Sequence, residues 1–133
     1  MKRILHILAK VVLSLILLLP VVGTTGILGE ATRDLYNTDL AFAFIQILTT
    51  VMYINYMMAV VHIVALIAFW TKREALAALL IAPITANVVA FHYFIDGGPF
   101  TSGAVLGNVM LLLNIYFLWV NREAYGSLLA PKA

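Results

Sequence analysis

The sequence contains no cysteine. This absence excludes thiol–disulfide exchange and metal centres held by thiolates, including iron–sulfur clusters ligated by cysteine. Charged residues are also scarce, at 11% of the chain, against about 25% in ordinary soluble domains. The net charge of +2 is too small and too divided between loops for a nucleic-acid-binding protein. No group of candidate ligands has the spacing of a metal site, so we expect none.

Hydrophobic residues make up 64% of the chain and gather in long uncharged runs. The runs cover residues 11–29, 40–71, 75–95 and 97–121. Because a helix needs about 20 apolar residues to cross a bilayer, we predict an all-α fold, an integral membrane four-helix bundle in one domain over residues 1–133. The expected spans are roughly residues 5–28, 52–70, 75–95 and 104–120.

Basic residues lie almost entirely on one side of this predicted bundle. The exception is Arg33, which lies among acidic residues in a loop on the other side. The basic side carries Lys2, Arg3, Lys10, Lys72, Arg73, Arg122 and Lys132. The positive-inside rule assigns this side to the cytoplasm. We therefore expect a multi-pass protein of the cytoplasmic membrane with both termini in the cytoplasm.

The second run is too long for one span. Residues 40–71 would measure about 48 Å as a single helix, against a hydrocarbon core of about 30 Å. Within "LAFAFIQILTTVMY", polar side chains recur at spacings of three and four, the pattern of an amphipathic helix that lies on the surface. They are Gln46, Thr49, Thr50 and Tyr53. The excess therefore forms either an extracytoplasmic interfacial helix, with a turn near residues 53–56, or part of one long tilted helix.

Small and amide side chains inside the spans indicate helix packing. Gly103 and Gly107 are four apart, which lets helices approach closely, either within this bundle or between two copies. Asn87 and Asn114 are expected near the midplane of the third and fourth spans. There they can form an interhelical amide pair or contact a ligand.

A second group of polar residues is expected nearer the outer surface. His92 lies about 10 Å outward of its span's midpoint at about 1.5 Å per residue, and Asp96 follows one turn later on the same face. Asn55 and Tyr56 reach a similar depth on the second span. These side chains predict an outward-facing pocket for a molecule with a polar head and an apolar tail. The alternative is a His–Asp pair at the interface that is satisfied by water.

The three histidines do not predict a haem site. His62 is expected about 4–5 Å inward of the midplane, His92 about 10 Å outward and His6 about 15 Å inward, so no two share a depth. No intrinsic cofactor is therefore expected. For catalysis, His92 with Asp96 as its orienting partner is the only acid–base candidate.

Two stretches resemble the DoxX-like family of small bacterial four-helix membrane proteins. The first is "LLIAPITANVVAFHYFID" and the second is "LLLNIYFLWVNREAYGSLL". In the first, the residues that match the family's third helix are Pro83, Thr85, Asn87, Phe91, His92 and Phe94. In the second, the matching residues are Asn114, Tyr116, Arg122, Glu123 and Tyr125. The resemblance covers about residues 54–129.

The resemblance implies a protein of the bacterial inner membrane. It also implies an association with membrane oxidoreductase complexes and quinone-linked oxidation. Two departures concern activity: "GILGEATRD" follows the first helix where members often have a lysine and a phenylalanine, and His62 stands where many have a glutamate. These changes favour a specialised or accessory member.

We therefore predict a small accessory subunit of a larger redox or energy-transducing membrane complex, more an interaction protein than an enzyme. Its partners would be the lipid bilayer and other membrane protein subunits, with quinone or lipid as the ligand of the outward pocket. One alternative is a quinone-linked oxidoreductase subunit in which His92 exchanges a proton and Asp96 relays it. Another is a small transporter or lipid-handling protein that uses Asn87 and Asn114.

Overall fold

The computed structural model describes residues 1–131. These residues form helices joined by loops and contain no strand. This confirms the predicted all-α fold class for that part of the chain. The elements are α1 (Lys2–Gly23), η1 (Arg33–Leu35), α2 (Asp39–Val51), α3 (Tyr53–Trp70), α4 (Glu74–Ala90), η2 (Phe91–Ile95), α5 (Ser102–Val120), η3 (Arg122–Tyr125) and α6 (Gly126–Leu129). Lys132, one of the basic residues considered above, lies outside the described residues.

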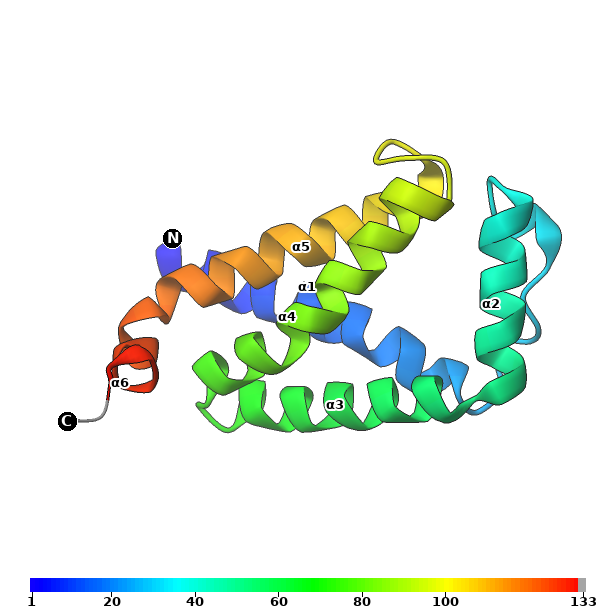
Figure 1. The fold of residues 1–133 in the computed structure, drawn as a ribbon. Helices are drawn as coiled ribbons and strands as arrows, with labels where there is room; N and C mark the ends of the chain where they lie inside the picture. Colours follow the sequence, from blue (N-terminus) through cyan, green and yellow to red (C-terminus); the bar gives the residue numbers. More distant parts are fainter. Residues whose placement is uncertain (132–133) are drawn as a thin grey trace.

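Four segments of the described chain are long and apolar enough to cross a membrane. They are α1, α3, α4 together with η2, and α5. They run alternately in opposite directions, so that the N-terminus and α6 lie at one end of the bundle (Figure 1). We call this the N-terminal end. The other end carries α2 and the α4–α5 loop, and we call it the α2 end.

The first helix is displaced from its expected position, residues 5–28. It begins at Lys2 and ends at Gly23, and Pro20 lies inside it without ending it. The hydroxyls of Thr24 and Thr25 donate to carbonyls of the last turn, at 2.7 and 2.6 Å. Gly26 then has a φ of 77°, a left-handed conformation that turns the chain out of the helix. The following residues lie in a loop for this reason.

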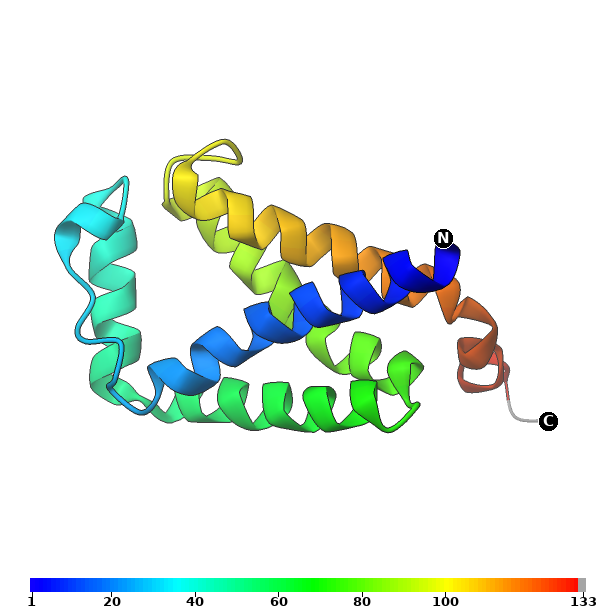
Figure 2. The same ribbon diagram turned by 180° about the vertical axis from the view of Figure 1, so that it is seen from behind.

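The hydrophobic core lies in the half of the bundle nearer the N-terminal end. Phe69 of α3 and Phe117 of α5 meet edge to face, with ring centroids 4.9 Å apart. Alanines on α3 and α4 let these helices approach each other and α1 closely. The alanines of this core cluster are Ala65, Ala68, Ala77 and Ala78. Toward the α2 end, the α1–α3 pair diverges from the α4–α5 pair (Figure 2).

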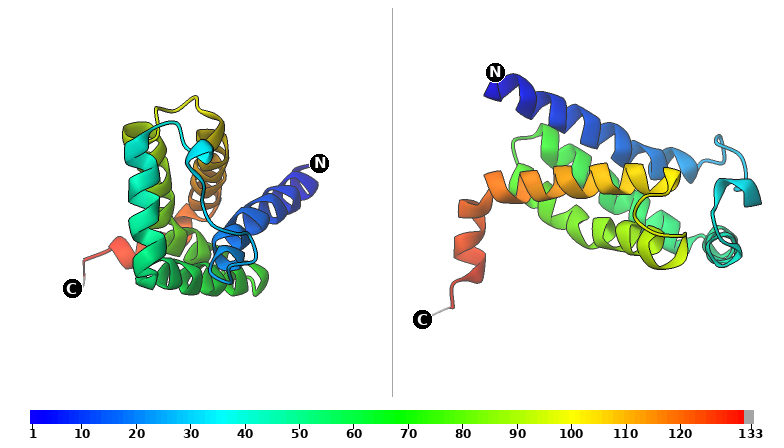
Figure 3. Two further views of the ribbon diagram at one scale, coloured as in Figure 1. Left: turned by 90° about the vertical axis from the view of Figure 1, so that its right-hand side faces the viewer. Right: turned by 90° about the horizontal axis from the view of Figure 1, so that it is seen from above.

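Residues 40–71 form two helices, so the alternative of one long helix is wrong. The break is at Met52, whose φ of 60° is left-handed and rare for a residue with a side chain. It falls one residue before the expected turn at residues 53–56. Helix α2 then runs steeply across the direction of α3 and bridges the two diverging helix pairs (Figure 3). Ala41 on α2 is buried, whereas Gln46 and Thr50 are exposed.

The predicted pair of midplane amides does not form. Asn114 is buried and its Nδ2 donates to the Ala78 carbonyl of α4, at 2.9 Å. Asn87 is exposed, and its Nδ2 donates to the Pro83 carbonyl of its own helix, also at 2.9 Å. Ala78 lies nine residues before Asn87 on α4, or about 13 Å along the helix, so the two amides lie at different depths and do not meet. Asn114 therefore holds α5 to α4 through backbone, and Asn87 holds no second helix.

This difference predicts unequal effects of two matched substitutions. Asn114→Ala removes a buried interhelical hydrogen bond and should lower the free energy of unfolding by about 1 kcal/mol. Asn87→Ala removes only a bond within one helix and should change stability by less than half of that. Unfolding of the purified protein in mild detergent, followed by circular dichroism, measures both. Equal losses in the two variants would contradict the assignment.

Candidate functional site

His92 and Asp96 come together at the α2 end, as their spacing predicts. His92 lies in η2, and Asp96 directly follows its last residue. In this π-helical turn the Asp96 N–H donates to the Phe91 carbonyl, at 3.0 Å. His92 Nδ1 lies 3.1 Å from Asp96 Oδ2. The Asp96 side chain is only 1% exposed and that of His92 15%. A carboxylate so deeply buried needs several donors.

The loop before α2 supplies the remaining donors to Asp96. The Asn37 backbone N–H donates to Oδ1 at 2.8 Å, and its side-chain amide lies 3.4 Å from Oδ2. Next to it, the Thr38 hydroxyl donates to the Ile95 carbonyl, at 2.6 Å, and also accepts from the Ala41 N–H as the cap of α2. We call these contacts of Asp96, His92, Asn37 and Thr38 the Asp96 network. It fastens the start of α2 to the end of η2.

The glycines of α5 provide the surface on which the His92 ring rests. A Cβ atom added to Gly103 would lie 2.9 Å from His92 Cε1, closer than real Cβ contacts. One added to Gly107 would lie 3.4 Å from His92 Cδ2 and from a side-chain carbon of Val88. The two small residues therefore pack against η2 and α4 of the same chain.

Aromatic rings cover the other side of this network. The Phe91 ring lies 5.7 Å from that of Phe44 on α2 and 6.3 Å from that of Tyr36 in the preceding loop, centroid to centroid. Burial, and then the nearby Asp96 carboxylate, raise the pKa of Tyr36 above its ordinary value. The ring contacts and the hydrogen bonds hold the same two segments together.

The predicted outward pocket is not assembled. Asn55 donates to the Leu48 carbonyl at 3.3 Å, across the joint between α2 and α3. Tyr56 and Asn87 are exposed on their helices. Of the residues expected to bind a ligand, the structure brings only His92 and Asp96 together. The donors that approach the Asp96 carboxylate come instead from Asn37, which the sequence analysis did not consider.

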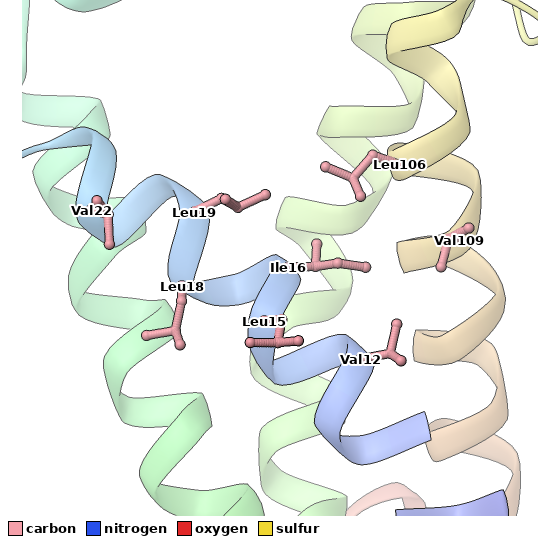
Figure 4. Close-up of a pocket in the computed structure, with 8 residues that line it drawn as sticks. All are labelled: Val12, Leu15, Ile16, Leu18, Leu19, Val22, Leu106 and Val109. Atoms are coloured by element: carbon pink, nitrogen blue, oxygen red, sulfur yellow. The ribbon is translucent and has the colours of Figure 1, made fainter. Parts of the chain in front are cut away.

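The described residues do form an apolar groove, between α1 and α5 (Figure 4). Its volume is about 420 Å³, and its surface is almost wholly hydrocarbon. The lining residues are Val12, Leu15, Ile16, Leu18, Leu19, Val22, Leu106 and Val109. The groove follows from the divergence of α1 from α5, which apolar periodicity does not indicate. Neither His92 nor Asp96 lines it.

A polar cluster that the sequence analysis missed lies at the N-terminal end. His6 Nε2 lies 3.0 Å from Glu74 Oε2, and the Lys10 ammonium donates to Glu74 Oε1, at 2.7 Å. The Tyr116 hydroxyl lies 2.9 Å from His6 Nδ1. The cluster joins α1, α4 and α5. The sequence did contain a signal for this cluster. His6 and Glu74 both fall at the predicted inner surface, where a histidine of one helix can reach a glutamate at the start of another.

The third histidine is in the core. His62 Nδ1 donates to the Leu17 carbonyl of α1, at 3.2 Å, and Nε2 is buried without a hydrogen-bond partner in the described chain. The three histidines thus lie at separate places. Within residues 1–131, no group of three histidine, cysteine, aspartate or glutamate side chains could hold a metal ion.

No family model, curated protein or solved structure matches this chain. The resemblance to the DoxX-like family rests on the two quoted stretches and stays a prediction. What the fold and the site define is a class: a helical protein with four helices long and apolar enough to cross a membrane, closed at one end by the Asp96 network.

The contacts of the His92 ring with α5 predict that alanine substitutions at Gly103 and Gly107 have very different effects on stability. Gly103→Ala should displace the His92 ring, break its bond to Asp96 and lower stability by about 1–3 kcal/mol, as overpacking does. Gly107→Ala places its Cβ at an ordinary contact distance and should be tolerated. Thermal unfolding in detergent gives the stabilities, and hydrogen exchange of the Asn37 amide reports whether the network is intact. Faster exchange in Gly107→Ala than in Gly103→Ala would contradict this account.

Proposed function

We propose that this chain is an integral membrane protein that crosses the bilayer four times, with both termini in the cytoplasm. The four long apolar helices and the charge distribution support this topology. The described basic residues near the N-terminal end are Lys2, Arg3, Lys10, Lys72, Arg73 and Arg122, whereas Arg33 alone lies near the α2 end. Such a bias favours a cytoplasmic N-terminal end, in the inner membrane of a bacterium if the family resemblance holds.

Helix α2 would lie along the outer surface of this membrane. It runs across the direction of α3, and therefore across the direction of a span (Figure 1). Its polar Gln46 and Thr50 are exposed on the side opposite the buried Ala41. A polar stripe facing away from the bundle suits a helix at the boundary between lipid and water.

Within the membrane, the protein acts as an accessory subunit of a larger redox or energy-transducing complex, without chemistry of its own. The observation that carries this proposal is the internal satisfaction of the polar side chains. Asn114 is bonded to backbone, Asp96 to Asn37 and His92, and Glu74 to His6 and Lys10. Apart from Nε2 of His92, such groups have little left to offer a substrate. Along the spans, what remains for recognition is the apolar surface of the helices.

The groove between α1 and α5 is a hollowed part of that surface. It is concave, it faces outward from the bundle, and it is lined by branched aliphatic side chains from two helices. Hydrocarbon of a partner subunit or of a bound lipid would fill it through close packing, since lipid offers no hydrophobic advantage to either side. The groove has almost no polar surface with which to recognise a small polar substrate.

Filling the groove should therefore weaken the association with partner subunits. Leu106→Trp places a large ring in the groove, and Ile67→Trp makes a comparable change on α3, at an exposed residue away from it. We expect Leu106→Trp to reduce the recovered partner at least about tenfold, the equivalent of ~1.4 kcal/mol. The measurement is quantitative mass spectrometry of proteins co-purified in gentle detergent from native membranes.

The control variant decides how this experiment is read. Ile67→Trp should retain the partner at the wild-type ratio. Retention in Leu106→Trp as well would exclude the groove as a contact. If variants on every lipid-facing surface retained the same partners, or if the wild type had none, the subunit proposal would be wrong.

A second candidate is a membrane subunit in quinone-linked oxidation, and the geometry of His92 favours it. Asp96 holds Nδ1, which leaves Nε2 as the nitrogen that exchanges a proton. In that reaction a donor on a partner subunit gives two electrons to the quinone, which also takes up two protons, one of them from His92. The Asn87–Asn114 pair, on which the transporter alternative depends, does not form.

His92→Ala tests this second candidate. If His92 delivers a proton, the variant should lose at least about a hundredfold in quinone-dependent turnover of the complex, the usual contribution of an acid–base group. Expression and partner binding should be unchanged. The variant Asp96→Asn should shift the pH profile without abolishing turnover. Wild-type turnover in His92→Ala would leave only the accessory role.

A further inference from the structure

We propose that the N-terminal end of the bundle binds the headgroups of anionic phospholipids. The surface is formed by five basic side chains, Lys2, Arg3, Lys72, Arg73 and Arg122, which we call the basic face. This inference concerns the surrounding lipid. It rests on the proposed membrane location but not on the accessory role, so each can fail without the other.

None of the five side chains of the basic face takes part in an ion pair within residues 1–131. Glu74, which lies among them, is already bound to Lys10 and His6. Glu123 is the other acidic residue at this end. At the α2 end the situation is reversed, because the single basic residue, Arg33, is paired with Asp39. The basic face thus carries an excess of positive charge that the protein does not neutralise.

Contacts between the chain segments gather these charges in one place. The bond from His6 to Glu74 sets the first turns of α1 against the start of α4. The Tyr125 hydroxyl donates to the Ala75 carbonyl at 2.9 Å, which folds η3 against the same turn of α4. The tight turn at Lys72, with a φ of 62°, brings the end of α3 to that point as well. Four segments therefore contribute to one surface.

Exposed aromatic and aliphatic groups border the charges. The Arg122 guanidinium lies 4.9 Å from the centre of the Trp119 ring, which is 67% exposed, and Trp70 is 56% exposed. Leu128 and Leu129 on α6 are also exposed. Indole rings favour the boundary between headgroups and hydrocarbon, and guanidinium binds phosphate through paired hydrogen bonds.

This combination identifies the ligand. A free phosphate would use the cations but not the rings or leucines, and an acidic soluble protein would leave the exposed indoles without a role. A phospholipid supplies phosphate to the cations and hydrocarbon to the apolar groups at once. A net negative headgroup is required because a zwitterionic one brings its own cation to the surface.

The two tryptophans of the chain both lie at this end, so their fluorescence reports the lipid bound there. The protein is reconstituted into vesicles of phosphatidylcholine and phosphatidylglycerol in which one or the other carries brominated, quenching acyl chains. We expect quenching to show several-fold enrichment of phosphatidylglycerol over its bulk fraction. Higher salt should reduce the enrichment, because salt screens exposed charges.

Variants with a matched control locate the effect. The double variant Arg73→Gln, Arg122→Gln should lose about fivefold in lipid preference for each guanidinium removed. Arg33→Gln removes one guanidinium at the α2 end and should leave the preference unchanged, whereas either single variant, Arg73→Gln or Arg122→Gln, should reduce it. Arg73→Lys with Arg122→Lys keeps the charge and should retain most of it. Trp70→Phe restricts the signal to Trp119 beside Arg122.

Three results would overturn the inference. One is equal quenching of wild-type protein by the two lipids. Another is the same lipid preference in the double glutamine variant as in Arg33→Gln. The last is removal of the preference by inorganic phosphate at matched ionic strength, which would make the basic face a site for a simple anion. Helical content by circular dichroism confirms that each variant is folded.

Discussion

The structure depends on one constraint: a chain with so few charges and so much hydrocarbon must satisfy most of its buried polar groups from within, with Nε2 of His62 as an exception. In an apolar surrounding there is no water to do so, and each unsatisfied group costs several kcal/mol. Asp96 shows the consequence most clearly. Its buried carboxylate requires donors, and the donors come from Asn37 and His92. The loop before α2, the π-helical turn and the glycines of α5 are all placed by that requirement.

The same constraint gives the two ends of the bundle different characters. At the N-terminal end, Glu74 is neutralised by Lys10 and His6, and the aromatic core closes the helices around it. At the α2 end the helix pairs diverge, and α2 is held across them by the Asp96 network on one side and by Met52 on the other. Divergence also opens the groove between α1 and α5. With most polar groups engaged inside, the molecule offers its surroundings this apolar groove and the basic face at its N-terminal end.

Much of this architecture could be predicted from the sequence, because length and apolar composition determine the helices. The separation of α2 from α3 followed from a run too long for one span, and the contact of His92 with Asp96 from their spacing. The partner that a buried amide meets on another helix was not predictable. Asn114 meets the Ala78 carbonyl, nine residues before Asn87 on α4, whereas Asn87 bonds only within its own helix. Asn37 and Glu74 were missed because their partners are far away in the chain, where no periodic pattern connects them.

The central claim is that this protein works by association in the membrane and has no chemistry of its own. The most direct test is native mass spectrometry of the wild-type protein extracted with its surrounding membrane, combined with analysis of the small molecules that it retains. The account predicts a defined assembly in which this chain occurs in fixed stoichiometry with larger membrane subunits. A lone chain that carries stoichiometric quinone and turns it over without any partner would contradict it.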